Sequence, residues 1–155
     1  MGGNQKAEVP AAPPRWLIPW ITRCHVALYE WSGGRVGARV QQMPHVVVRG
    51  VGRRSGKPFA VCLPYWLDEE GVRIVVASFA GATRNPAWYH NMRDRDANPT
   101  VELRDGDHVS PVRVEEIVGE ERDRIWKQIV EDRPFYGRYQ DKTARRIPLL
   151  RLLEI

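Results

Sequence analysis

The chain has 155 residues, of which 43% are hydrophobic and 28% are charged. This length corresponds to one domain, and the composition allows a core of normal size, which excludes a globally disordered chain. Two cysteines are too few for a disulfide scaffold, and they match no zinc-binding spacing. The N-terminus shows no secretory signal pattern, and charged residues interrupt the longest apolar stretch, which excludes a membrane span. We therefore expect a cytoplasmic protein without a metal site.

Positive charge is concentrated in the first half of the chain. Residues 1–66 hold nine lysines and arginines and only two acidic residues, whereas the remainder carries a small negative balance. Such a local surplus is typical of a protein that binds an anion, which could be a phosphorylated ligand, a nucleic acid or a membrane surface. No nucleic-acid-binding motif accompanies the surplus, so we expect no nucleic-acid partner.

The N-terminal region is predicted to contain one helix. Residues 1–14 are rich in glycine, alanine and proline and are expected to form a disordered lead-in, and residues 15–32 are expected to form an amphipathic helix. A stripe of this kind either packs on the domain or lies at a membrane surface, so peripheral membrane contact stays open as an alternative. The apolar residues at helical spacing are Leu17, Trp20, Ile21, Cys24, Leu28 and Trp31.

Residues 43–155 have mainly the character of β-strands. Two helices, at 86–93 and 120–131, interrupt them, and Asn85 is the expected cap of the first. Asp105-Gly106 is a dipeptide favoured in tight hairpin turns. So few helices among six strands favour a mainly β, α+β fold built on a six-stranded antiparallel barrel, in one domain over residues 15–155. The predicted strands are His45–Arg49, Phe59–Leu67, Val72–Phe79, Thr100–Arg104, His108–Ile117 and Ile147–Ile155.

The segment Gly50–Pro58 has the composition of an anion-binding turn. It does not match the nucleoside-triphosphate loop, because Val51 stands where that loop needs its first glycine and Pro58 where it needs serine or threonine. Its three glycines still let backbone amides approach an anion, beside three cations and a hydroxyl. A phosphate or a carboxylate would suit this loop, and a solvated basic hairpin is the alternative.

Two further segments could line a pocket. In Ala77–Asn91, small residues end a buried strand and would let a flat ring approach the backbone, and a helix start follows beside Arg84. In Pro134–Gln140, three aromatic residues lie in a segment too broken for a helix interior, which suggests either a pocket wall or a tyrosine-rich surface turn. The histidines are scattered, and no serine elbow or pair of carboxylates stands out. The pattern therefore indicates a redox protein whose cofactor carries the chemistry.

These segments resemble the deazaflavin-dependent nitroreductase family of actinobacteria. The resemblance runs from about Met43 to the C-terminus and rests on the ordered motifs GRRSGKP, VCLPY, VVASFAGATRNPAWYHN, ANPTVEL and YGRYQDKTARRIPLLRL. It implies a split β-barrel of the flavin-reductase-like fold that uses coenzyme F420, an 8-hydroxy-5-deazaflavin. The implied activity is hydride transfer from the reduced cofactor to a small-molecule acceptor, namely a quinone, an activated enone or a nitro compound. The oligomeric state would be a monomer or a homodimer.

The resemblance also implies the site residues. Phe59 and Phe79 stand where the family often has basic residues, so a barrel that binds FMN or another ligand, or a non-catalytic cofactor carrier, is the alternative. Residues implied to hold the anionic tail of the cofactor are Arg53, Arg54, Ser55 and Lys57. Residues implied to contact its ring or tail are Val61, Cys62, Leu63, Pro64, Ala77, Ser78, Phe79, Ala87, Trp88, Tyr89, His90, Asn91 and Tyr136. Hydroxyls implied for catalysis are those of Ser78, Tyr65, Tyr136 and Tyr139.

Overall fold

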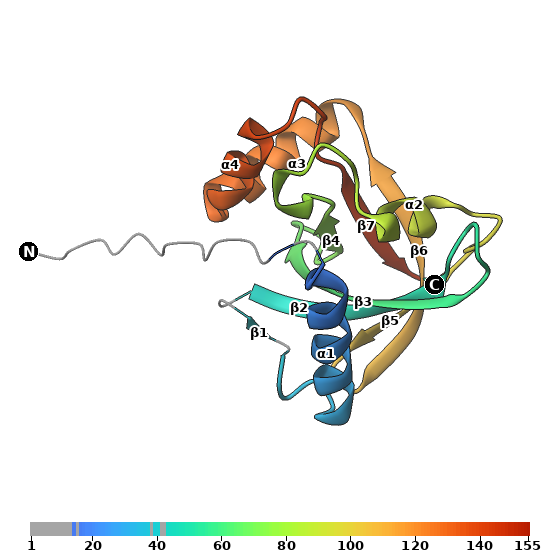
Figure 1. The fold of residues 1–155 in the computed structure, drawn as a ribbon. Helices are drawn as coiled ribbons and strands as arrows, with labels where there is room; N and C mark the ends of the chain where they lie inside the picture. The colour runs from blue at the N-terminus through green and yellow to red at the C-terminus, as the bar shows by residue number, and fades with distance from the viewer. Residues whose placement is uncertain (1–13, 15, 38, 41–42) are drawn as a thin grey trace, which may run out of the picture.

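The computed structural model describes residues 14, 16–37, 39–40 and 43–155, so the predicted lead-in lies almost wholly outside the described residues. Six antiparallel strands form a closed barrel with helices on its outside (Figure 1). A two-residue strand, β1 (Arg39–Val40), adds to the start of β2. The sheet closes because β5 returns to pair with β2, which confirms the predicted six-stranded barrel. The order around it is β2 (Met43–Val51), β3 (Pro58–Leu67), β4 (Arg73–Val76), β7 (Leu149–Glu154), β6 (His108–Ile117) and β5 (Val101–Asp105).

Alternation along the strands fills the barrel interior. Val46 and Val48 on β2 face Leu103 on β5 and Leu150 on β7, and all four are fully buried. Period-two alternation sends these residues to one face of the sheet, and closure turns that face into a core. The hairpin between β5 and β6 is confirmed, since Asp105 pairs with His108 and Gly106 adopts a φ of +62°.

The C-terminal half of the sheet is covered by two helices, α3 (Gly119–Asp132) and α4 (Phe135–Asp141), which enclose a second core. The prediction that 134–140 is too broken for a helix is wrong. Pro134 occupies the N-cap, where its missing N–H costs nothing, and Gly137 lets α4 approach Val130 of α3 closely. Pro134 and Gly137, which usually disfavour a helix, are therefore both compatible with α4.

The strand predicted at Val72–Phe79 is shorter than expected. After β4 the backbone leaves the sheet and enters a single turn, η1 (Phe79–Gly81), before α2 (Ala87–Arg93). The prediction that Asn85 caps α2 is wrong, because Pro86 is the N-cap and the Oδ1 atom of Asn85 accepts a hydrogen bond from Arg145 at 2.7 Å. A long-range partner thus overrides the local capping preference of asparagine.

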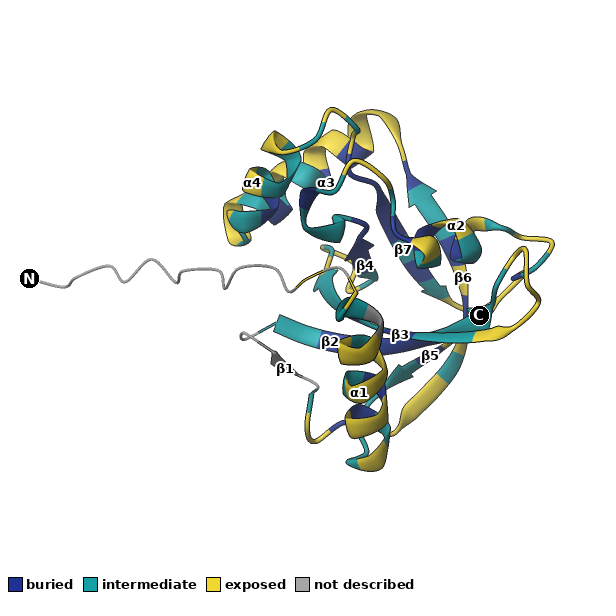
Figure 2. Ribbon diagram, viewed as in Figure 1, coloured by how far each residue is buried: buried dark blue, intermediate teal, exposed yellow. Residues whose placement is uncertain are grey.

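Helix α1 (Ile18–Trp31) packs on the outside of β2 and β3, as its amphipathic pattern predicts. The face that packs is different from the predicted stripe. Val26 and Tyr29 cover Val47, whereas Trp20 and Trp31 are 63% and 84% exposed and form part of an outward face (Figure 2). The helix is apolar on nearly every side, so periodicity alone cannot choose the buried face. Two polar contacts fix which face of α1 is buried.

The two contacts are a tyrosine hydroxyl and an ion pair. The Tyr29 hydroxyl donates to the His45 carbonyl at 3.3 Å and accepts from the Gly106 amide at 2.6 Å, and Glu30 pairs with Arg49. None of the helices in the described ranges is long and apolar enough to cross a membrane. Peripheral contact through α1 stays a prediction.

Candidate functional site

The basic loop predicted at Gly50–Pro58 is a tight turn between β2 and β3. The Gly52 amide donates to the Lys57 carbonyl at 2.8 Å, and the Gly56 amide donates to the Gly52 carbonyl at 2.7 Å. The Ser55 hydroxyl accepts a hydrogen bond from the Lys57 amide at 3.2 Å, so it stabilises the turn itself. Arg53 and Arg54 are exposed at the tip, like Lys57.

Asn98, which the sequence did not single out, fastens this turn to helix α2. Its side chain is almost fully buried, and its Oδ1 atom accepts from the Val51 amide at 2.8 Å. Its Nδ2 atom donates at 2.8 Å to the carbonyls of both Val51 and Asn91. The Asn91 side chain in turn accepts from the Arg53 amide at 3.2 Å. Two predicted segments are therefore held together at one end of the barrel.

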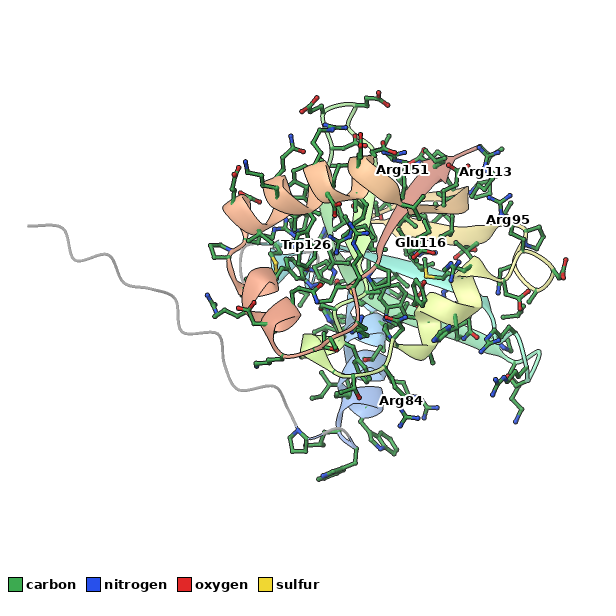
Figure 3. All side chains as sticks on the ribbon, turned by 90° about the horizontal axis from the view of Figure 1, so that it is seen from above. Arg84, Arg95, Arg113, Glu116, Trp126 and Arg151 are labelled. Atoms are coloured by element: carbon green, nitrogen blue, oxygen red, sulfur yellow. The ribbon has the colours of Figure 1, made fainter. Side chains whose placement is uncertain are left out.

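Cations dominate this end of the barrel. The pKa of His90 is lowered, first by partial burial and then by the charges of Arg53, Arg93 and Arg54. Within the described part of the chain, no carboxylate pairs with Arg53, Arg54 or Lys57. Arg84 also reaches the surface without such a partner, and it lies apart from the paired Arg113 and Arg151 (Figure 3). Uncompensated arginines of this kind are suited to a phosphate or carboxylate.

The small-residue segment after β4 forms a strained turn against α4. Phe79 and Ala80 have φ values of 45° and 53°, a left-handed conformation that side chains other than glycine rarely adopt. A Cβ atom on Gly81 would lie 2.6 Å from the Tyr139 carbonyl oxygen, so only glycine allows this close approach of the turn to α4. The Ser78 hydroxyl has no hydrogen-bond partner among the described residues, which leaves it available to a ligand.

The four predicted hydroxyls do not lie together. Tyr139 is partly exposed beside the turn that follows Ser78, and burial raises its pKa. Tyr136 is only 2% exposed, and burial raises its pKa to about 12, against a smaller opposing effect of Arg133. The Tyr65 side chain packs against the barrel core instead, and its hydroxyl donates to Asp105 at 3.4 Å. Of the four residues, Ser78 and Tyr139 are thus the two at the turn, and Tyr139 contacts it through its backbone.

Several residues predicted to contact the cofactor are buried in this structure. Val61 and Leu63 lie in the barrel core. Tyr89 is buried there too, and its hydroxyl donates to Glu116 at 3.0 Å. Cys62 lies under α1, with its Sγ atom 3.7 Å from the His25 Nε2 atom, and burial raises the pKa of its thiol to about 12.

The other predicted contacts have mixed surroundings. Trp88 is partly buried and packs against the barrel core, whereas Ala87 and His90 are exposed on α2. Pro64 pairs with His45 of β2, and from the next residue onward β3 pairs with β4. Ala77 is fully buried.

Two arginines near the turn were missed by sequence reasoning. Arg145 donates to the carbonyls of Ala77, Ser78 and Ala82. Arg133, whose side chain is 12% exposed, donates to the Tyr65 carbonyl at 2.9 Å. Arg145 lies within the motif YGRYQDKTARRIPLLRL, but the partners of both arginines lie more than sixty positions away in the chain, so the sequence did not indicate what either residue contacts.

Two shallow depressions lie along β6. One, of about 250 Å³, is lined by residues of the β5–β6 hairpin such as Thr100 and Ser110. The other, of about 300 Å³, includes Arg95 and Glu116, which lie away from Arg84 in Figure 3. Over the residues that the structure describes, no group of three or more histidine, cysteine or acidic side chains could hold a metal ion.

Comparison with known proteins identifies the family. The family model of the F420H(2)-dependent quinone reductases matches residues 20–154. An F420H(2)-dependent quinone reductase of Mycobacterium tuberculosis is 32% identical over 144 residues, which cover 88% of this chain and 94% of the relative.

Two solved structures share the fold. An F420-H2 dependent reductase, FDR-A, is 42% identical, with 70% of this chain and 93% of that chain covered and a TM-score of 0.58. A domain-swapped dimer is 38% identical, with 87% and 98% covered and a TM-score of 0.61. The predicted resemblance is confirmed: this chain belongs to the F420H(2)-dependent quinone reductase family and is a reductase that depends on coenzyme F420.

Proposed function

We propose that the protein transfers a hydride from reduced coenzyme F420 to a quinone. The observation that carries this proposal is the family match over residues 20–154, and the site at the end of the barrel is consistent with it. When bound, the cofactor supplies a hydride donor in its reduced deazaflavin ring. The protein supplies binding, orientation and a group that stabilises charge on the acceptor.

The basic turn fits the anionic tail of this cofactor. Arg53, Arg54 and Lys57 are exposed, carry no paired carboxylate among the described residues, and are fixed to α2 through Asn91 and Asn98. Arginine side chains make bidentate contacts to phosphates and carboxylates, the two groups of the tail. These cations would hold the tail, and Ser78 and Phe79, which follow the buried Ala77, would lie against the ring.

Hydroxyls and one cation are available for the acceptor. Ser78 directly precedes the turn, and the backbone of partly exposed Tyr139 contacts it. Either hydroxyl would donate a hydrogen bond to an acceptor oxygen that gains negative charge. Arg133 would add a positive charge on the Tyr65 side. Of the four hydroxyls implied by the resemblance, that of Tyr136 is less suited to this role than those of Ser78 and Tyr139. Tyr136 is almost fully buried, and its raised pKa makes it a poor proton donor.

The test has a binding step and a turnover step. Isothermal titration calorimetry with oxidised F420, and with FMN in parallel, should give micromolar binding of the deazaflavin and much weaker binding of FMN. Oxidation of F420H2, followed by the visible absorbance of the product, should then be faster with menadione than with cyclohexenone or a nitroimidazole. A Ser78→Ala variant should lower kcat with menadione by about a hundredfold, the lower end of the range for loss of one oxyanion donor.

Each other result has a definite meaning. Tight FMN binding with little F420 binding would favour a barrel specific for another flavin. F420 binding without turnover on any acceptor would favour a cofactor carrier, and preference for the nitro compound or the enone would overturn the quinone assignment. As for assembly, the domain-swapped relative supports a homodimer, which sedimentation of the full chain would distinguish from a monomer.

A further inference from the structure

Arg145 is bonded almost entirely to one loop. Its Nε atom donates to the Ala82 carbonyl at 2.7 Å, its Nη1 atom to the Ala77 carbonyl at 3.2 Å, and its Nη2 atom to the Ser78 carbonyl at 2.6 Å. Nη1 also donates to the Asn85 side chain at 2.7 Å. Within the described residues no carboxylate pairs with this guanidinium. Four of its five N–H groups therefore serve the loop 77–85.

The loop needs such a restraint because its backbone is strained. Phe79 and Ala80 both adopt positive φ values, and strained conformations persist only where the surroundings impose them. The rigid, planar fork of a guanidinium can address several carbonyls at fixed angles, which a lysine cannot do. Arg145 is itself held in place, since Gln140 donates to its carbonyl at 2.7 Å and accepts from the Ile147 amide at 3.0 Å.

The direction of the carbonyls fixes the direction of the amides. In a planar trans peptide, the N–H points opposite to the C=O. Because the carbonyls of Ala77, Ser78 and Ala82 turn toward Arg145, the amides of Ser78, Phe79 and Thr83 turn away from it. The guanidinium thus sets the direction in which three backbone amides of the loop point.

We propose that Arg145 is the positioning residue that shapes the loop 77–85 to receive the deazaflavin ring. This inference rests on the proposed function, because it takes the loop as the wall of the cofactor site. Arg145 acts through the loop and needs no contact with the cofactor. Its replacement should loosen the loop and weaken cofactor binding together, while the barrel stays folded.

The experiment compares Arg145→Ala, Arg145→Lys and Arg146→Ala with the wild-type chain. Arg146 is the matched control, because the neighbouring guanidinium pairs with exposed Asp123 and makes no contact with the loop. The first readout is hydrogen–deuterium exchange of the unliganded proteins. Arg145→Ala should speed exchange in peptides covering 77–85 by tenfold or more and leave the barrel strands unchanged.

The second readout is F420 affinity by calorimetry. We expect the Kd to rise at least tenfold in Arg145→Ala, to remain raised in Arg145→Lys, and to stay within twofold of wild type in Arg146→Ala. Methylguanidinium at millimolar concentration should restore protection of the loop and affinity to Arg145→Ala alone. Loss of loop protection and of F420 affinity in Arg145→Ala, with rescue of both by methylguanidinium, would support the proposal. Faster exchange that is confined to 77–85 would also show that the variant is not generally unfolded.

Two outcomes would overturn the inference. Unchanged exchange in 77–85 would show that Arg145 does not hold the loop, and unchanged affinity in Arg145→Ala would show that the loop shape does not matter for binding. A wild-type chain that binds no F420 would instead overturn the proposed function. The exchange comparison distinguishes the two failures, because it is made without cofactor.

Discussion

Tyrosine hydroxyls in this protein differ mainly in what surrounds them. Tyr29 and Tyr89 are buried and bonded to groups from other elements, and Tyr136 is buried among the aromatic residues of the second core. Tyr139, by contrast, is partly exposed beside a strained turn. The tyrosine-rich segment Pro134–Gln140 therefore contains one tyrosine with a structural role, Tyr136, and one candidate for catalysis, Tyr139.

Replacing Tyr136 by phenylalanine should flatten the alkaline stability profile. The folded-state pKa of Tyr136 is raised from 10.0 to about 12, so the folded protein holds this proton more tightly than the unfolded chain does. The resulting stabilisation is complete below pH 10 and is lost as the pH rises to about 12. Urea unfolding at several pH values in this window should therefore show a steeper fall in unfolding free energy for the wild type.

A separate turnover assay compares the two tyrosines. Tyr139→Phe should lower the rate of menadione reduction, whereas Tyr136→Phe should leave that rate within about twofold. A flat wild-type profile between pH 10 and 12 would contradict the raised pKa. A large loss of turnover in Tyr136→Phe would contradict its structural role.

Individual site residues can be predicted from the sequence where the local composition alone indicates their arrangement. The exposed cations of the basic turn could be identified, because a short loop rich in glycine and arginine has few other arrangements. Arg145 and Asn98 could not be identified, since each acts on backbone groups of distant segments. Hydrogen bonds between residues far apart in sequence leave no local pattern.

Among the elements, the strands and the β5–β6 turn followed from local patterns, and helix α1 was predicted with the wrong face buried. Alternation specifies a strand face uniquely because its period is two. A helix with apolar residues on most sides has no unique face, so Tyr29 and Glu30 decide how α1 docks. Helix α4 was missed because proline and glycine, which usually end a helix, here begin it and let it pack.

The Tyr29 hydroxyl should be a main anchor of α1. Tyr29→Phe would remove the hydrogen bond from the partly buried Gly106 amide, and a bond of this kind typically contributes about 0.5–1.5 kcal/mol. Chemical denaturation should show this loss. Trp31→Ala, on the exposed side of the same helix, should change the unfolding free energy by no more than about 0.5 kcal/mol. Equal effects of the two changes would show that the docking face has been misassigned.

At the scale of the whole molecule, one end of the barrel carries a local cluster of positive charge. Among the described residues, Arg53, Arg54 and Lys57 lie without a paired carboxylate where the β2–β3 turn meets α2, whereas Arg113 and Arg151 form ion pairs on another part of the surface (Figure 3). An anionic ligand would therefore be attracted to one end of the barrel. Salt screens this attraction, because the Debye length falls as ionic strength rises.

F420 affinity should fall as ionic strength rises. Calorimetry in about 50 mM and about 500 mM sodium chloride, across which the screening length falls severalfold, should show the Kd rising by roughly tenfold. Arg53→Ala should reduce this dependence on salt, and Arg113→Ala should leave it as in the wild type. An affinity that is indifferent to salt would mean that these cations do not hold the cofactor tail.

The outward face of α1 also determines how the protein will behave optically. Trp20 and Trp31 on this face, together with Trp16 just before the helix, are half of the six tryptophans in the chain and are between 63% and 84% exposed. Their indole emission will occur at long wavelength, will be accessible to iodide or acrylamide, and will change little when the barrel unfolds. Replacing these three by phenylalanine would leave Trp66, Trp88 and Trp126, all partly buried against the two cores, as fluorescent reporters of the fold.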